Sequence, residues 1–166
     1  MEEFNTTLVN LKSSVWTVGF LVPIDIAENY LKINDKRVIC FLNNTLKIHA
    51  ALMPKGEGKW FVNVNKQIQK KLKITEGSNL FISIQTDESK YGMEPPEEFI
   101  ELLNQDENGR NIFEQLTMGK QRTLLHLVLK IKSSQIRIDK SIRILEYLKN
   151  VNGKLDFKEL NQALKG

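Results

Sequence analysis

The chain has 166 residues, of which 41% are hydrophobic and 27% charged, and its formal net charge is +4. This hydrophobic content suffices for a folded core and excludes wholesale disorder, and no apolar run approaches the roughly 20 residues of a membrane-spanning helix. The single cysteine, Cys40, excludes an intramolecular disulfide and a multi-thiolate metal site, and its apolar neighbours predict a buried side chain.

The first half of the chain, to about residue 87, predicts a β domain. Short segments rich in β-branched and aromatic residues are the expected strands: 16–22, 37–42, 45–52, 59–64 and 80–84. Asn43-Asn44 and the segment 54–58, which contains Gly56 and Gly58, have the composition of turns.

An internal repeat with an offset of 42 residues runs through this half. Residues 20–30 align with residues 62–72, so that Phe20 matches Val62 and Ile26 matches Ile68, and a strand follows each copy. Each copy therefore predicts a strand, a short helix and a second strand, with Pro23 and Asn65 at the two helix starts. Two such copies can close a barrel about a pseudo-twofold axis.

The polar segment 86–97 predicts a linker, and we place the domain boundary at residue 93, giving domains 1–92 and 93–166. Beyond it, Pro96 precedes an expected helix with the stripe Phe99, Leu102 and Leu103, which Asn108-Gly109 is expected to break. Residues 122–131, apolar nearly all round, predict a buried central helix.

Two further helices complete the expected all-helical segment. In the first, Ile138, Ile142, Leu145 and Leu148 are expected on one face, and the basic residues Arg137, Lys140 and Arg143 on the opposite face. Asn152-Gly153 should end that helix. Asp156 should cap the last helix, forming a capping box with Glu159.

Charge is segregated within the helical segment. Residues 93–114 hold seven acidic residues against Arg110, and residues 120–143 hold seven basic residues against Asp139. One interpretation is that neighbouring helices carry complementary solvated faces. The other is that the basic stretch binds an anion and the acidic stretch a cationic partner.

The first domain resembles a bacterial domain-of-unknown-function family over residues 4–90. The resemblance rests on Phe20-Leu21-Val22-Pro23, on the segment from Ala51 to Gly58, and on Val64-Asn65-Lys66. The second domain, over residues 95–150, resembles the bacteriocin-protection, YdeI or OmpD-associated family through three marks: Pro96-Glu97-Glu98-Phe99, Gln121-Arg122, and Lys132 with Arg137.

These resemblances imply a fold and a role. The first implies a double-split β-barrel, the barrel class of AbrB-type and MazE-type regulators, so that the expected fold is α+β with a pseudo-duplicated barrel followed by helices. The second implies a link to resistance against antimicrobial peptides. Because the repeat places both halves of the barrel in one chain, we expect a monomer.

No catalytic or metal-binding constellation is evident in the sequence. The chain has no Gly-x-Ser-x-Gly elbow and no Cys-His pair, and its two histidines, His49 and His126, lack a partner at ligand spacing. We therefore expect a non-enzymatic protein with no catalytic residues, metal or cofactor, and interpret both histidines as structural.

The basic residues give the clearest candidate site. In the barrel a lysine cluster spans residues 55–73 and surrounds Trp60. The residues predicted to bind a peptide or an anionic ligand are Lys55, Trp60, Lys66, Lys70, Arg122, Lys132, Arg137 and Lys140. Met53 and Trp60 are expected to converge with the basic helix face at the junction of the two domains.

The expected function is that of a cytoplasmic binding or stress-protection protein, because the first residues of the sequence are acidic and unlike a secretory signal. The alternative is nucleic-acid binding through the barrel lysines. Against the alternative, the helix of the first copy carries Asp25 and Glu28 where the second carries lysines, whereas a twofold reader would need both halves basic.

Overall fold

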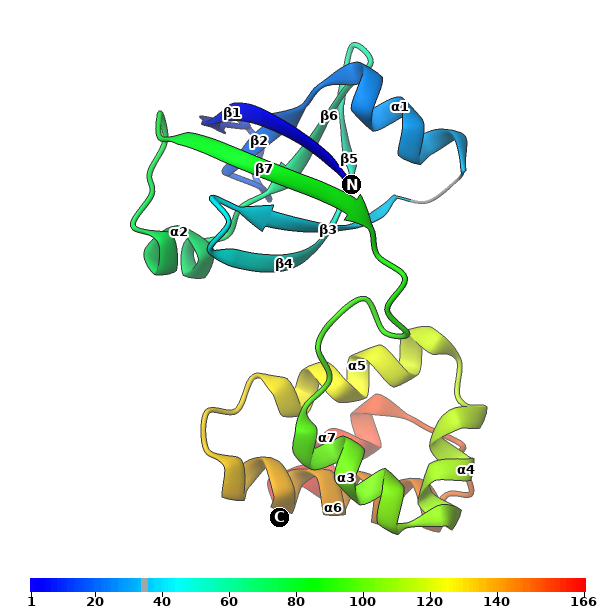
Figure 1. Ribbon diagram of the computed structural model, residues 1–166. Coiled ribbons are helices and arrows are strands. Elements are labelled where there is room, and N and C mark those ends of the chain that lie inside the picture. Colours follow the sequence, from blue (N-terminus) through cyan, green and yellow to red (C-terminus); the bar gives the residue numbers. More distant parts are fainter. Residues whose placement is uncertain (34–35) are drawn as a thin grey trace. The chain divides into compact units, whose positions relative to one another are not determined.

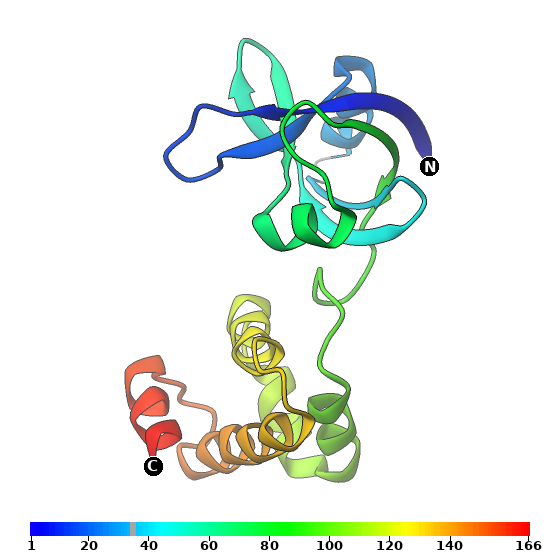
Figure 2. The same cartoon turned by 90° about the vertical axis from the view of Figure 1, so that its left-hand side faces the viewer.

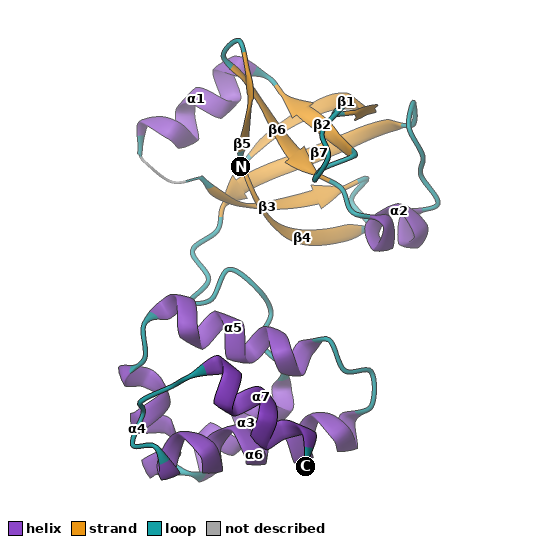
Figure 3. Cartoon of the chain, turned by 180° about the vertical axis from the view of Figure 1, so that it is seen from behind, coloured by secondary structure: helices purple, strands orange, loops and turns teal. Residues whose placement is uncertain are grey.

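The computed structural model describes residues 1–33 and 36–166, which form two compact units, Met1–Gly92 and Met93–Gly166. The N-terminal unit is α+β and the second unit, here called the helical unit, contains helices joined by loops (Figures 1 and 3). Each unit is described by itself. Among the described residues, no helix is both long and apolar enough to span a bilayer.

The N-terminal unit is built on a curled sheet of seven antiparallel strands in the order β4-β3-β7-β1-β2-β6-β5. The strands are β1 (Glu2–Asn10), β2 (Val18–Val22), β3 (Arg37–Leu42), β4 (Leu46–Ala51), β5 (Met53–Gly56), β6 (Lys59–Asn63) and β7 (Asn79–Thr86). Helix α1 (Ile24–Lys32) follows β2, and helix α2 (Lys66–Leu72) follows β6. The five expected strands and both expected helices are confirmed, and β1 and β5 are additional.

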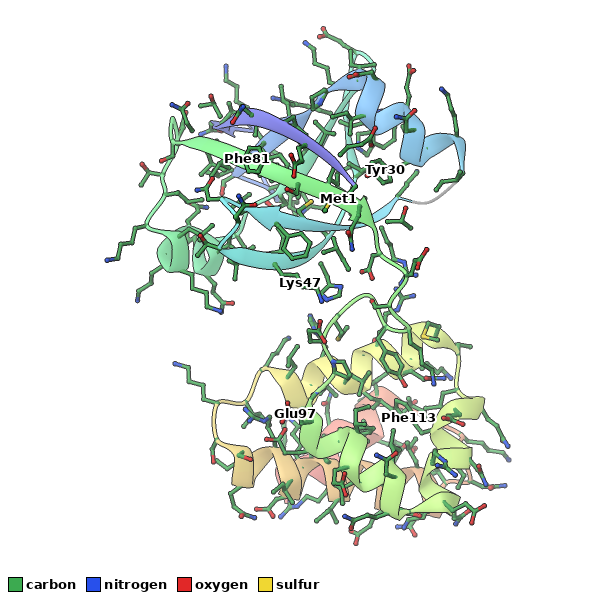
Figure 4. All side chains as sticks on the ribbon, in the orientation of Figure 1. Met1, Tyr30, Lys47, Phe81, Glu97 and Phe113 are labelled. Atoms are coloured by element: carbon green, nitrogen blue, oxygen red, sulfur yellow. The ribbon has the colours of Figure 1, made fainter. Side chains whose placement is uncertain are left out.

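The core of this unit follows from alternation along the strands. In β1, Phe4 and Leu8 point inward, while Asn5 and Thr7 between them are exposed. Tyr30 of α1 reaches the same core, and its hydroxyl donates to the Ile84 carbonyl oxygen at 2.9 Å (Figure 4). Cys40 is fully buried as expected, and burial raises the pKa of its thiol to about 12.

Two strand pairings have a register that relates the halves of the unit. In the β2–β6 pair Phe20 lies opposite Val62, and in the β3–β7 pair Phe41 lies opposite Ser83. Both partners are 42 positions apart, the offset of the sequence repeat. Strand β1 pairs with β7, placing Glu2 opposite Ile84, and β4 pairs with β3, placing Leu46 opposite Leu42.

The helical unit contains five helices in its described residues (Figure 2). They are α3 (Glu97–Gln105), α4 (Glu107–Gln115), α5 (Met118–Leu129), α6 (Ser134–Asn150) and α7 (Phe157–Lys165). Phe99 and Phe113, both fully buried, pack with ring centroids 5.1 Å apart and join α3 to α4. Figure 4 shows Phe113 among the helices of this unit.

The break between α3 and α4 is not where the sequence predicted it. Asn108 and Gly109 lie inside α4, and the chain turns at Asp106 instead. The Asp106 carboxylate caps α4 by accepting from the Gly109 N–H at 2.8 Å. It occupies the space that a Cβ at residue 109 would need, so Gly109 is used for this close approach rather than to end a helix.

Two predicted helix faces are corrected. Helix α5 begins at Met118, with Thr117 as its cap, and it is amphipathic rather than buried all round, since His126 and Leu129 are exposed. In α6 the buried residues are Ser141, Ile144, Leu145 and Leu148, whereas Ile142 is 38% exposed.

The ends of α6 and α7 confirm most of the local predictions. Helix α6 ends at Asn150, and Asn152 and Gly153 follow with positive φ. Asp156 caps α7 through the N–H groups of Lys158 and Glu159. The reciprocal half of a capping box is absent here, because the Asp156 N–H donates to the Tyr147 hydroxyl.

Candidate functional site: a basic groove between β4 and α2

Helix α2 is held firmly against the sheet despite its length of seven residues. The Asn65 side chain caps it by accepting from the Ile68 N–H at 3.0 Å, and the Gln69 amide donates to the Val64 carbonyl oxygen at 2.8 Å. Ile68 and Leu72 pack against the sheet core. The position of the helix beside β4 is therefore fixed by local contacts.

A groove of about 530 Å³ lies between α2 and β4. It is lined by Leu46, Lys47, Ile48, Gln67, Ile68, Lys70 and Lys71, and we call it the basic groove. Its floor is apolar, because the buried Ile48 and the half-buried Leu46 and Ile68 form it. Its rim carries the exposed Lys70 and Lys71 together with Lys47, which Figure 4 shows on β4.

The charge of the groove follows from this lining. Three of its seven residues are lysines and none is acidic. Lysine ammonium groups act as point charges for phosphate and carboxylate groups. A ligand that matches the groove therefore has a negative group at the rim and an apolar part against the floor.

The structure separates the predicted site residues of the N-terminal unit. Lys70 lines the basic groove, whereas Lys66 lies on the first turn of α2 outside its lining. Lys55 is exposed on β5. Trp60 lies on β6, where the Lys36 ammonium is 5.6 Å from its ring centroid. Sequence reasoning found the lysine cluster but missed Lys47, because only the fold brings β4 beside α2.

In the helical unit the expected role of Arg137 is corrected. Arg137 lies on the same face of α6 as the buried residues Ser141 and Ile144, not on the opposite solvated face. Its guanidinium donates to Glu98 Oε1 at 2.7 and 2.9 Å and to the Ile131 carbonyl oxygen at 2.8 Å. Arg137 therefore ties α6 to α3, and it pairs the predicted acidic and basic stretches.

The other predicted residues of the helical unit lie in separate places. Lys140 lines a hollow of about 320 Å³ with Arg143 and Leu164, and Arg122 lines another of about 210 Å³ with His126. Lys132 is exposed. The expected convergence of this basic face with Met53 and Trp60 involves residues of both units and stays a prediction.

The Glu98 ion pair predicts a pH dependence for the helical unit. Hydrogen bonds from Arg137 and then Ser134 lower the pKa of Glu98 from 4.5 to about 2. Because the folded state holds this pKa below its unfolded value, the stabilisation is present above pH 4.5 and is lost as pH falls toward 2. The melting temperature of the native chain, measured by circular dichroism, should fall as the pH is lowered from 4.5 toward 2. In Glu98→Gln this fall should be smaller. Equal pH profiles for both proteins would contradict it.

A second polar cluster lies at the end of β7. Asp87, 2% exposed, accepts from His49 Nδ1 at 2.8 Å and from the Ser89 N–H at 2.9 Å. Burial alone would raise the pKa of Asp87, but the hydrogen bonds from Ser89 and His49 outweigh it and keep the pKa below its ordinary value. The carboxylate is therefore ionised, and His49 carries its proton on Nδ1.

This pair was missed because His49 and Asp87 are 38 positions apart and meet only through the sheet. His49 also lines a hollow of about 240 Å³, whose lining contains no serine, threonine or cysteine. Within residues 1–33 and 36–166, no group of three or more histidine, cysteine or acidic residues has the geometry to hold a metal ion.

Comparison with known proteins gives one finding. Residues 4–84 match the family model of DUF1905, a domain of unknown function. The match covers both helices of the N-terminal unit and its sheet except for the first residues of β1 and the last of β7, and it ends before the helical unit. No curated protein and no solved structure matches the chain.

Proposed function

We propose that the N-terminal unit is a non-catalytic binding module that takes an amphipathic anion in the basic groove. The observation that carries this proposal is an apolar floor with three lysines and no carboxylate in the lining. The hollow beside His49 does not add a catalytic alternative of equal weight, since no nucleophilic side chain lines it.

The architecture we propose for this module is a pseudo-duplicated double-split barrel. Its support is the strand register, because an antiparallel pair in which repeat-equivalent residues face each other has a local twofold axis. Phe20 with Val62 and Phe41 with Ser83 both meet that condition. By the same register β1 and β4 are counterparts, with Glu2 equivalent to Leu46.

The two halves differ at the positions that this pseudo-symmetry relates, and the groove belongs to the second half. The counterpart of Lys71 is Asn29, whose side-chain amide donates to Glu2 Oε1 at 2.8 Å and joins α1 to β1. In the second half these two positions are Lys71 and Leu46, which line the groove. The first half thus has a polar link and acidic residues where the second has an opening and lysines, which favours an asymmetric binding module.

Replacing the two α2 lysines of the groove tests the proposal. Anilinonaphthalene sulfonate is an aromatic anion that fluoresces on binding. It should bind the native chain, and its affinity should fall with added salt. Lys70→Gln with Lys71→Gln should reduce its affinity about fivefold, the loss of two exposed ion pairs of about 0.5 kcal/mol each. The matched control, Lys55→Gln with Lys66→Gln, removes two exposed lysines outside the groove and should change little.

Two results would contradict the proposal. One is equal affinity of the native chain and the Lys70/Lys71 variant, and the other is an equal loss in both double variants. Fluorescence of the two tryptophans, both in the N-terminal unit, reports whether each variant folds.

Nucleic-acid binding is the second candidate, and it is favoured by the further exposed lysines of the α2 region, Lys66 and Lys73. A polyanion crossing α2 would contact these residues as well as the groove, whereas a small anion would not. A single-stranded oligonucleotide whose affinity falls steeply with salt, and whose salt slope falls by about one for each of these lysines removed, would support this candidate.

The link to antimicrobial peptides belongs to the helical unit and rests on its resemblance to the bacteriocin-protection family. The finding that bears on it is a groove of about 470 Å³ between α3 and α6, lined by Glu97, Glu98, Glu101, Leu102, Ser134 and Ile138. Because Glu98 is paired with Arg137, the match in sign with a cationic amphipathic peptide rests on Glu97 and Glu101, and we keep peptide protection as a proposal on that ground.

A further inference from the structure

The basic groove adjoins the hollow beside His49. Ile48 and Ile68 line both spaces, so the two share a wall. The hollow, of about 240 Å³, is also lined by the apolar residues Trp16, Ala50, Ala51 and Met53 and by the polar residues His49, Asn63 and Asn65, and no lysine lines it. The two adjoining spaces along β4, together called the depression, therefore have the lysines at one end and the apolar side chains of Trp16 and Met53 at the other.

The length of this depression follows from β4 itself. Lys47 lies near one end of the strand and Ala51 at the other. Four residues of extended strand span about 13 Å. An extended alkyl chain with bonds near 1.5 Å covers that distance with roughly ten carbon atoms.

Trp16 lies at the apolar end of the depression, and its side chain is not part of the hydrophobic core of the unit. It is 36% exposed and lies in the connection between β1 and β2, where its ring packs edge-on against Phe61 with centroids 6.1 Å apart. An exposed aromatic ring held by a buried one offers apolar contact area whose orientation is already fixed.

We infer that the ligand is elongated: a carboxylate or phosphate group at Lys70 and Lys71, and an apolar chain that runs past Ile48 and Ile68 to Trp16. This inference rests on the proposed function and adds the shape and chemical class of the ligand. We take the ligand to bind as a single molecule from solution, because α2 bounds the groove on one side.

A series of straight-chain alkyl carboxylates of increasing length, each below its micelle-forming concentration, tests the inference. Trp60→Phe leaves Trp16 as the only tryptophan, so its emission reports the hollow directly. Each added methylene should raise the affinity about fourfold, the equivalent of about 0.8 kcal/mol, until the depression is filled. Trp16 emission should shift to shorter wavelength only for the chains long enough to reach it.

A blocking variant keeps the test specific. Ala51→Leu narrows the hollow at its lining while leaving the groove lysines in place. It should lower the affinity for long chains and leave that for short chains unchanged. Trp16→Phe in the otherwise native chain repeats the affinity series without relying on the Trp60 variant.

The outcomes distinguish failure of this inference from failure of the proposed anion-binding function. Affinity that is independent of chain length, but still lost in the Lys70/Lys71 variant, would overturn the inference and leave the anion-binding proposal standing. Failure of every carboxylate and of anilinonaphthalene sulfonate to bind would overturn both. Binding to phosphatidylglycerol vesicles in sedimentation, with no binding of free carboxylates, would overturn the inference in favour of a membrane surface.

Discussion

Replacing Gly19 by alanine is expected to destabilise the N-terminal unit by about 3 kcal/mol, at the upper end of overpacking costs, because backbone must move. Gly19 lies on β2, opposite Val9 of β1 and Asn63 of β6. A Cβ there would collide with the Val62 carbonyl oxygen and lie 2.9 Å from Leu11 Cδ1. The strands can relieve this contact only by moving apart.

Denaturant unfolding followed by tryptophan emission measures this effect, since Trp16 and Trp60 both lie in the N-terminal unit. The control is Gly119→Ala in α5, where an added Cβ meets nothing within 4 Å. Its unfolding is followed by circular dichroism, because both tryptophans lie outside the helical unit. Because alanine is the better helix former, that variant should be neutral or stabilised by up to about 1 kcal/mol. A Gly19→Ala midpoint equal to the native one would show that the strands yield without cost.

Replacing Asp87 by alanine should cost about 3 kcal/mol in the same unit. Its carboxylate is almost fully buried, and it accepts from His49 and twice from Ser89. Removing the shared acceptor of buried hydrogen bonds typically costs about 1–3 kcal/mol for each donor left unsatisfied, because that donor loses its compensation. The His49 side chain is 13% exposed and Ser89 is partly buried, which places the sum for the two residues at about 3 kcal/mol.

The comparison with Ser89→Ala separates the contributions. That variant removes only the serine hydroxyl and should cost about 1 kcal/mol. The contribution of Asp87 should also depend on pH. Its folded-state pKa lies below the ordinary value of 3.8, so the stabilisation is present above that pH and disappears as pH falls below it. A Ser89→Ala loss as large as that of Asp87→Ala would contradict the role given to His49.

The sequence was sufficient for elements whose signal is local. Apart from β5, the strands from residue 16 onward were predicted correctly, as were the caps at Asn65 and Asp156, because these features depend on neighbouring residues. Strand β1 was missed because its polar outward residues hide the alternation of Phe4 and Leu8. Strand β5 was read as a turn because it is short and contains Pro54, which is tolerated at the edge of a sheet.

The candidate site was only partly predictable, because it depends on contacts between distant segments. The lysine cluster identified Lys70, but the floor of the groove comes from β4, about twenty residues earlier. Arg137 was placed on the wrong face because the hydrophobic stripe of α6 was drawn through Ile142, which is partly exposed. The charge of Arg137 suggested solvent, whereas Glu98 satisfies it at the packed surface of α3.

The central position of β1 has a kinetic consequence. Glu2 to Thr7 pair with Asn79 to Ile84, so the first strand to leave the ribosome waits for the last strand of the sheet. Contacts of such long sequence separation slow folding, since most of the loop entropy is lost before they form. Until β7 emerges, one edge of β1 remains unpaired. The N-terminal unit should therefore complete its sheet only after β7 has emerged, and truncation of its first ten residues should remove the middle of the sheet rather than a dispensable end.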